Sequence, residues 1–168
     1  VPNEKIVFHG NNKSDKELEF AVRNNIKVIV DNDYDLERLD EISNSFNHDL
    51  EIMIRFTPGI ECHTHEYIRT GSFDSKFGFG IEYLNILFNR ISNTKHLKLK
   101  GLHAHIGSQI FELDPHKDLG EIMVKVILDA KKFGHNIEEL NVGGGLGIRY
   151  TESDDPPSID EWVKTISS

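Results

Sequence analysis

Two histidines and a serine stand close together in the stretch GLHAHIGSQI, which covers residues 101–110. Because side chains alternate along a strand, His103 and His105 are expected on the same face. Such a pair can bind a transition metal, pack in a core, or place a flat imidazole against a flat ligand ring. The small residues Ala104 and Gly107 leave room for a ring, so the three interpretations all stay open from spacing alone.

A second stretch, ELNVGGGLG at residues 139–147, puts three glycines directly after an apolar run. Gly143, Gly144 and Gly145 predict a loop without side chains, whose backbone N–H groups can approach a phosphate closely. The alternative is a turn that needs positive φ angles. Three consecutive glycines after a strand favour phosphate binding, although the pattern is neither the dinucleotide fingerprint nor a Walker motif.

Other reactive side chains are weaker candidates. Arg55 ends a buried-looking strand and needs an anionic or polar partner, which a ligand and a structural salt bridge explain equally well. Lys13 and Lys76 lie in predicted loops; either could form a Schiff base, but most loop lysines are merely solvated. Cys62 has no activating neighbour except His63, so we interpret it as a bystander.

A metal site is the main competing hypothesis. His63 and His65 repeat the spacing of the first histidine pair, and Asp31 could add a carboxylate at another strand end. A metal-dependent barrel hydrolase that uses the two H-x-H pairs therefore stays as an alternative, although we assign no metal ligands.

The elements that must position these residues alternate in type. β-Branched and apolar runs predict strands at 5–10, 26–31, 50–56, 97–107 and 139–145. Helical periodicity predicts helices at 14–25, 35–47, 84–91, 119–130 and 159–166, and residues 57–79 form a long polar loop. Strands separated by helices imply an α/β fold with a parallel sheet, either doubly wound or a (β/α) barrel.

In either architecture the ligand site lies at the carboxyl ends of the strands. The polar residues gather after the predicted strands, and the opposite strand ends carry nothing comparable. Five strands are too few for a closed eight-stranded barrel. This one-sided clustering predicts a domain built around a small-molecule site.

Composition narrows the class of partner. The 168 residues suffice for one domain, and the net charge of -9 argues against nucleic acid or an anionic membrane. One cysteine excludes an internal disulfide and fits a reducing, cytoplasmic compartment. No apolar run approaches the roughly 18 residues of a membrane-spanning helix. Both ends of the chain look cut.

Four segments together resemble the diaminopimelate decarboxylases, which are pyridoxal-phosphate enzymes of lysine biosynthesis. They are IVFHGNNKS, RFTPGIECHTHEYIRTGSFDSKFG, GLHAHIGSQI and LNVGGGLGIRY, in the order and spacing of that family. The resemblance implies decarboxylation of meso-2,6-diaminopimelate to L-lysine and CO₂. Alternatives are another basic amino-acid decarboxylase of the same fold, acting on arginine, ornithine or carboxynorspermidine, and a non-catalytic cofactor-binding module.

The resemblance also implies roles for single residues toward pyridoxal 5'-phosphate. It places His105 against the cofactor ring and Arg55 close to that ring. It places Ser108 and the backbone of Gly143, Gly144 and Gly145 at the phosphate, and His65 and Ile68 in a loop over the substrate. His103 receives no firm role.

The implied organisation is a section of a larger protein. The five strands resemble the third to seventh of a TIM-like (β/α)8 barrel, so residues 1–168 would form a partial cofactor-binding domain. The family's Schiff-base lysine, on an earlier strand, and its C-terminal β domain have no counterpart here, and Lys13 does not match that lysine. We therefore expect a homodimer for the intact enzyme, no activity for this chain alone, and low stability from two unpaired sheet edges.

Overall fold

A sheet of parallel strands forms the centre of the computed structural model, which describes residues 1–60 and 77–168. Its main strands lie in the order β1-β2-β3-β5-β6, and β4 pairs in parallel with the end of β3. The strands are β1 (Val7–Phe8), β2 (Lys27–Val30), β3 (Leu50–Thr57), β4 (Phe79–Gly80), β5 (Leu97–His103) and β6 (Glu139–Asn141).

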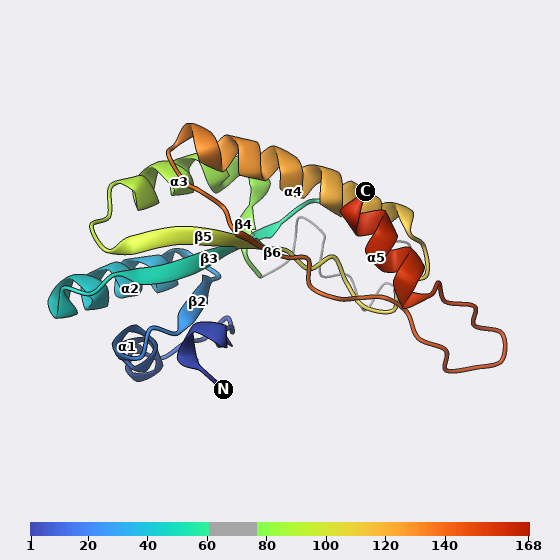
Figure 1. Ribbon diagram of the computed structural model, residues 1–168, viewed down its shortest axis with the longest axis horizontal. Coiled ribbons are helices and arrows are strands. Elements are labelled where there is room, and N and C mark those ends of the chain that lie inside the picture. Colours follow the sequence, from blue (N-terminus) through green and yellow to red (C-terminus); the bar gives the residue numbers. More distant parts are fainter. Residues whose placement is uncertain (61–76) are drawn as a thin grey trace.

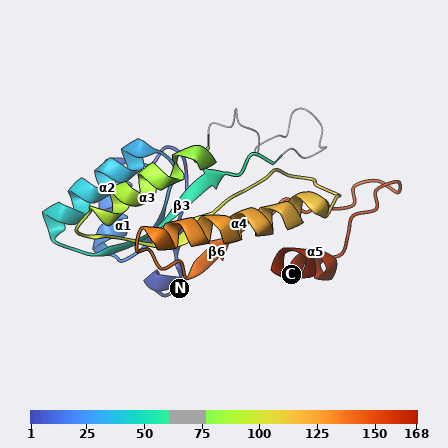
Figure 2. The same ribbon diagram turned by 90° about the horizontal axis from the view of Figure 1, so that it is seen from above.

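Helices connect the strands and lie alongside the sheet (Figure 1). They are α1 (Asp15–Arg23), α2 (Asp33–Phe46), α3 (Leu84–Ser92), α4 (Asp114–Lys132) and α5 (Ile159–Ser167), with short 3₁₀ helices η1 (Asn3–Lys5) and η2 (Ile81–Tyr83). Figure 2 shows α2, α3 and α4 lying next to one another, and α5 packs on α4. This alternation of parallel strands and helices confirms the predicted α/β fold and the prediction that the chain forms a section of a parallel (β/α) barrel.

Local sequence signals set the helix starts that matter for the site. Ser14 and Glu17 form a capping box at the start of α1, so the chain leaves the loop after β1 in a fixed direction. Asn32 caps α2 by accepting a hydrogen bond from the backbone N–H of Asp35 at 2.9 Å. Both helices therefore begin directly beside a strand end.

The apolar core lies between the inner strands and the helices. All four residues of β2 are buried, and large side chains such as Phe56, Phe88 and Leu102 are almost completely enclosed. The edge strands are less enclosed than the inner ones: all three residues of β6 are exposed, and so is Val7 of β1. In the described ranges β6 lies at one edge of the sheet, where no further strand covers it.

Several predicted bounds need correction. The strand predicted at 97–107 ends at His103, so His105 lies beyond it, and the helix predicted at 119–130 spans Asp114–Lys132. The first strand is shorter than 5–10, because Asn3–Lys5 coils into η1. The last strand stops at Asn141 instead of residue 145, since Gly143 adopts φ 70° and leaves the extended conformation. The predicted loop 57–79 ends in β4, where Phe79 pairs with Phe56.

Charged side chains also gather at the amino ends of the strands, contrary to the sequence-based expectation. Lys27 is buried at the start of β2, where it forms ion pairs with Glu51 at 3.3 Å and with Glu139. A buried ammonium needs such partners.

No helix in the described parts is long and apolar enough to cross a membrane.

We predict that Gly101→Ala destabilises the sheet. The register between β3 and β5 shifts at this point, and a Cβ on Gly101 would lie 2.7 Å from the Met53 side chain and 3.1 Å from the Glu139 carbonyl oxygen. We expect a loss of about 1–3 kcal/mol in the free energy of unfolding, measured in urea. Gly144→Ala is the control, because its Cβ would meet no atom within 4 Å; equal losses in both variants would contradict the packing argument.

Candidate functional site

Polar side chains from five neighbouring strands meet at one edge of the sheet. His9 follows β1, Asp31 follows β2, Arg55 lies near the end of β3, His103 ends β5, and Asn141 ends β6. Arg55 and His103 are partners in the strand register. Because all these strands run in parallel, their carboxyl ends form a single rim, which is the expected place for a ligand in such folds.

Arg55 is the central cation of this rim. Its Nη1 lies 3.4 Å from Asp31 Oδ1 and 3.3 Å from His9 Nε2, and its guanidinium lies 4.7 Å from the centre of the Phe77 ring. Burial lowers the pKa of Arg55, and the nearby Asp31 carboxylate partly offsets this. The structure therefore shows a salt bridge to Asp31 and a hydrogen bond to His9, both through Nη1, and within residues 1–60 and 77–168 the other guanidinium donors have no hydrogen-bond partner.

The hydrogen bond to Arg55 fixes the state of His9. A guanidinium can only donate, so Nε2 of His9 must accept and its proton must sit on Nδ1. Burial, followed by the charge of Arg55, lowers the pKa of His9 accordingly. The His9 ring lies edge-on to that of His103, with 4.9 Å between ring centres.

His103 is held in a defined tautomer as well. Its Nδ1 lies 3.1 Å from the carbonyl oxygen of Asn141, which can only accept, so Nδ1 carries the proton. Burial lowers its pKa to about 4, against the opposing effect of that hydrogen bond. Nε2 is then an acceptor, and within the described residues it is buried without a hydrogen-bond partner.

The glycine loop packs directly against His105, which lies two residues beyond the end of β5. The backbone N–H of Gly144 points at Nδ1 of His105 across 3.5 Å, and a Cβ on Gly143 would lie 2.7 Å from the same nitrogen. Burial, then the charge of Arg55, lowers the pKa of His105. A neutral flat ring therefore stands beside a loop without side chains.

The glycines serve the turn that sequence analysis named as the alternative. Gly143 and Gly145 have φ angles of 70° and 99°, and a Cβ on Gly145 would lie 2.3 Å from the carbonyl oxygen of Gly107. The N–H of Gly143 donates to Asn141 Oδ1 at 2.9 Å. Nothing lies within 4 Å of a Cβ on Gly144, so space remains above the middle of the loop.

The loop that carries Ser108 runs beside the glycine loop. The N–H of Ile110 donates to the carbonyl of Gly145 at 2.8 Å, and the N–H of Gly147 donates back to Ile110 at 2.9 Å. Ser108 is exposed at the top of this loop. The fold therefore brings the loops that carry His105, Ser108 and the three glycines side by side, with Arg55 close enough to affect the His105 ring.

Lys13 differs from the sequence-based interpretation of a solvated loop lysine. It is 4 % exposed and forms an ion pair with Asp35, with 2.5 Å between Nζ and Oδ2. Sequence analysis missed Asp35, as well as His9 and Asn141. The only signal for Asp35 was its position four residues after Asp31, in the first turn of a predicted helix.

Five further candidates lie outside the described residues. They are Cys62, His63, His65, Ile68 and Lys76. Among the residues that the structure does describe, no group of three or more His, Cys, Asp or Glu side chains could hold a metal ion. Residues 1–60 and 77–168 therefore contain no metal centre that would support the alternative of a metal-dependent hydrolase.

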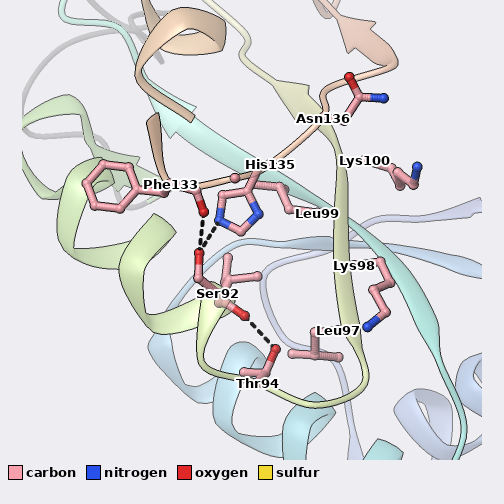
Figure 3. Close-up of a pocket in the computed structure, with 11 residues that line it drawn as sticks. Ser92, Thr94, Leu97, Lys98, Leu99, Lys100, Phe133, His135 and Asn136 are labelled. Carbon is pink, nitrogen blue, oxygen red and sulfur yellow. Dashed lines mark hydrogen bonds between the residues drawn. The ribbon is translucent and has the colours of Figure 1, made fainter. Parts of the chain in front are cut away.

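A separate cavity of about 340 Å³ lies at the opposite end of β5, beside the C-terminus of α3. Figure 3 shows that some of its polar groups contact one another: Ser92 Oγ donates to the carbonyl of Phe133 at 2.8 Å and lies 3.1 Å from Nε2 of His135. Because these groups already have partners, we interpret the cavity as part of the packing between α3 and the loop after α4, and not as a ligand site.

The whole chain, residues 1–168, matches the family described as pyridoxal-dependent decarboxylase, pyridoxal binding domain. Diaminopimelate decarboxylase of Synechocystis sp. is 56% identical over 161 residues, which cover 96% of this chain and 34% of that protein. Diaminopimelate decarboxylase of Bacillus subtilis is 40% identical over 171 residues, which cover 98% and 38%. The chain thus spans little more than a third of the length of these relatives.

The fold has close counterparts among solved structures. A crystal structure of diaminopimelate decarboxylase from Helicobacter pylori, complexed with L-lysine, superposes with a TM-score of 0.91 at 30% identity, covering 99% of this chain and 42% of that one. The enzyme from M. jannaschii, also with L-lysine, gives a TM-score of 0.88 at 29% identity.

The neutral state of His103 predicts a pH-dependent stability. Its folded pKa of about 4 lies below the unfolded value of 6.5, so below pH 6.5 the unfolded chain binds a proton that the folded chain does not. The free energy of unfolding should fall as pH drops from 6.5 to 4, by about 3 kcal/mol at most from this residue. Urea unfolding of His103→Gln should show a shallower fall than that of the parent protein. A His103→Gln slope that equals the original one would contradict this assignment.

Proposed function

Because the chain belongs to the pyridoxal-dependent decarboxylase family, as its pyridoxal-binding domain, we propose that it holds pyridoxal 5'-phosphate at the carboxyl ends of its strands. The observation that carries this proposal is the contact between the glycine loop and His105. It places backbone donors and a flat neutral ring side by side, which suits a flat cofactor that ends in a phosphate.

The phosphate fits the glycine loop on steric and electrostatic grounds. The side-chain-free surface above Gly144 has room for it, and the backbone N–H of Gly145 can donate to its oxygens, while the N–H of Gly144 is directed at Nδ1 of His105. Gly143 contributes the turn, because its own N–H already donates to Asn141. The exposed hydroxyl of Ser108, on the adjoining loop, supplies a further donor.

The ring of the cofactor fits between His105 and Arg55. His105 is neutral at neutral pH, so it can lie against a heteroaromatic ring without placing a second cation beside Arg55. Arg55 has donors to spare for an oxygen of the cofactor or substrate. When bound, pyridoxal phosphate supplies an electron sink for the electron pair that a departing carboxylate leaves behind.

We propose that the intact protein decarboxylates meso-2,6-diaminopimelate to L-lysine and CO₂. The names of the relatives support this substrate, as does the L-lysine in the Helicobacter pylori structure. His65 and Ile68 would lie over the substrate. Lys13 is engaged by Asp35, so we do not propose it as the lysine that holds the cofactor.

We further propose a cytoplasmic homodimer for the intact protein. The single cysteine suits a reducing compartment, and the chain's net charge of -9 does not suit nucleic acid or an anionic membrane as a partner.

The direct test supplies the intact protein with meso-diaminopimelate and pyridoxal phosphate and follows both CO₂ and lysine. We expect release of both in equal amounts, and no release when the cofactor is removed. Arginine and ornithine are the competing substrates. A higher kcat/KM for either of them would assign the protein to another decarboxylase specificity, and cofactor-independent turnover would overturn the proposal.

A charge reversal in the glycine loop tests the phosphate site by itself. Gly144→Asp should fit sterically but repel the phosphate, which we expect to weaken binding of pyridoxal phosphate by at least about tenfold, or 1.4 kcal/mol. Fluorescence titration measures the affinity, with Gly144→Ala as the matched control. Binding of pyridoxal, which lacks the phosphate, should be the same in both variants. Equal losses for both ligands would place the phosphate elsewhere.

A further inference from the structure

A buried ion pair lies next to Asp31, the carboxylate that contacts Arg55. Lys13 follows β1 and Asp35 lies in the first turn of α2; their side chains are 1 % and 2 % exposed, and Nζ lies 2.5 Å from Oδ2. The Nζ also donates to the carbonyl oxygen of Gly10. With two acceptors on its ammonium, Lys13 is not offered to a ligand as a nucleophile.

Burial of this pair is not explained by stability alone. Removing two charges from water is costly, and an apolar pair of similar volume is often as stable. The pair of Asp129 with Lys132 on α4 is solvated by comparison, since its side chains are 42 % and 71 % exposed. What a buried pair supplies is a fixed geometry for the groups attached to it.

Those groups lead to Arg55 in two steps. Oδ2 of Asp35 accepts the backbone N–H of Asp31 at 3.1 Å, which fixes the residue at the end of β2. Oδ1 of Asp31 then lies 3.4 Å from Nη1 of Arg55. The contacts connect the loop after β1, the start of α2, the end of β2 and the end of β3.

The charges alternate along this path, and the alternation keeps Arg55 available. Lys13 neutralises Asp35, which leaves Asp31 as the carboxylate that contacts Arg55. Without the ammonium of Lys13, the buried carboxylate of Asp35 would have no cation beside it, and its hydrogen bond to the backbone N–H of Asp31 would no longer be held in place. Asp31, and with it the guanidinium of Arg55, would then be free to shift.

We propose that Lys13 and Asp35 are positioning residues that hold Asp31, and through it orient the guanidinium of Arg55 toward the bound ligand. The identity of that ligand as pyridoxal phosphate rests on the proposed function. The positioning itself is a property of the apo protein and can be measured without any ligand.

The test is a double-mutant cycle between Asp35→Asn and Arg55→Lys in the intact protein. In the apo form, each single variant should lower the melting temperature, Asp35→Asn by about 10 °C because it leaves the Lys13 ammonium buried and unpaired. The double variant should lose clearly less than the sum of the two single losses, because both changes break the same path. Lys13→Met in place of Asp35→Asn repeats the cycle from the other partner, should one variant fail to fold.

The same variants are then titrated with pyridoxal phosphate. Asp35→Asn should weaken binding by about tenfold, and this loss should shrink in the Arg55→Lys background, because Arg55 is then no longer there to be positioned. Asp129→Asn and Lys132→Met make the same substitutions in the exposed pair and should leave both melting temperature and affinity unchanged.

The outcomes separate the two proposals. Strictly additive losses in the apo cycle, or an unchanged cofactor affinity in Asp35→Asn when the parent protein binds the cofactor, would overturn the positioning role. Coupling in the apo cycle in a protein that does not bind pyridoxal phosphate would sustain the positioning role and overturn the proposed function.

Discussion

Parallel pairing of β2, β3 and β5 is the constraint on which the rest of the molecule depends. It brings the ends of these strands to one rim, so that residues far apart in the chain, such as Asp31, Arg55 and His103, become neighbours. It also requires a helix between successive strands, and the starts of α1 and α2 lie at the same rim. The start of α2 and the end of β2 therefore lie next to each other, and there the side chain of Asp35 accepts a hydrogen bond from the backbone N–H of Asp31.

Groups that can only donate or only accept determine the chemistry of this rim. Arg55 forces Nε2 of His9 to accept, so this imidazole is neutral, and the Asn141 carbonyl fixes the proton of His103 on Nδ1 while burial lowers the pKa of His103 to about 4 and keeps it neutral. Burial acts in the same direction on His105. Among the described residues, the rim therefore presents the guanidinium of Arg55, paired with Asp31, beside uncharged imidazole rings.

Much of the fold could be predicted because periodicity reports burial. The alternation of strands and helices, and the meeting of His105, Ser108 and Gly143–Gly145, followed from pattern and resemblance. The sequence did not reveal that Lys13 is buried, because its ion pair depends on Asp35, 22 residues away. Strand ends were missed for a similar reason: a glycine's φ angle or a 3₁₀ turn of Asn3–Lys5 ends pairing without changing the apolar pattern.

The shifted register in β5 has a consequence for how the site and the core share one strand. Leu99 pairs with Ile52 and Gly101 with Met53, so Lys100 is an extra residue that resets the phase of side-chain alternation. In the segment before Lys100, every second side chain packs in the core, so Leu97 and Leu99 are buried. The segment after it places His103 opposite Arg55. The two halves of β5 therefore alternate their side chains between the two faces of the sheet independently. Gly101 lies at the junction, so the half that carries His103 can orient its side chains toward the rim while the other half packs its side chains against the helices.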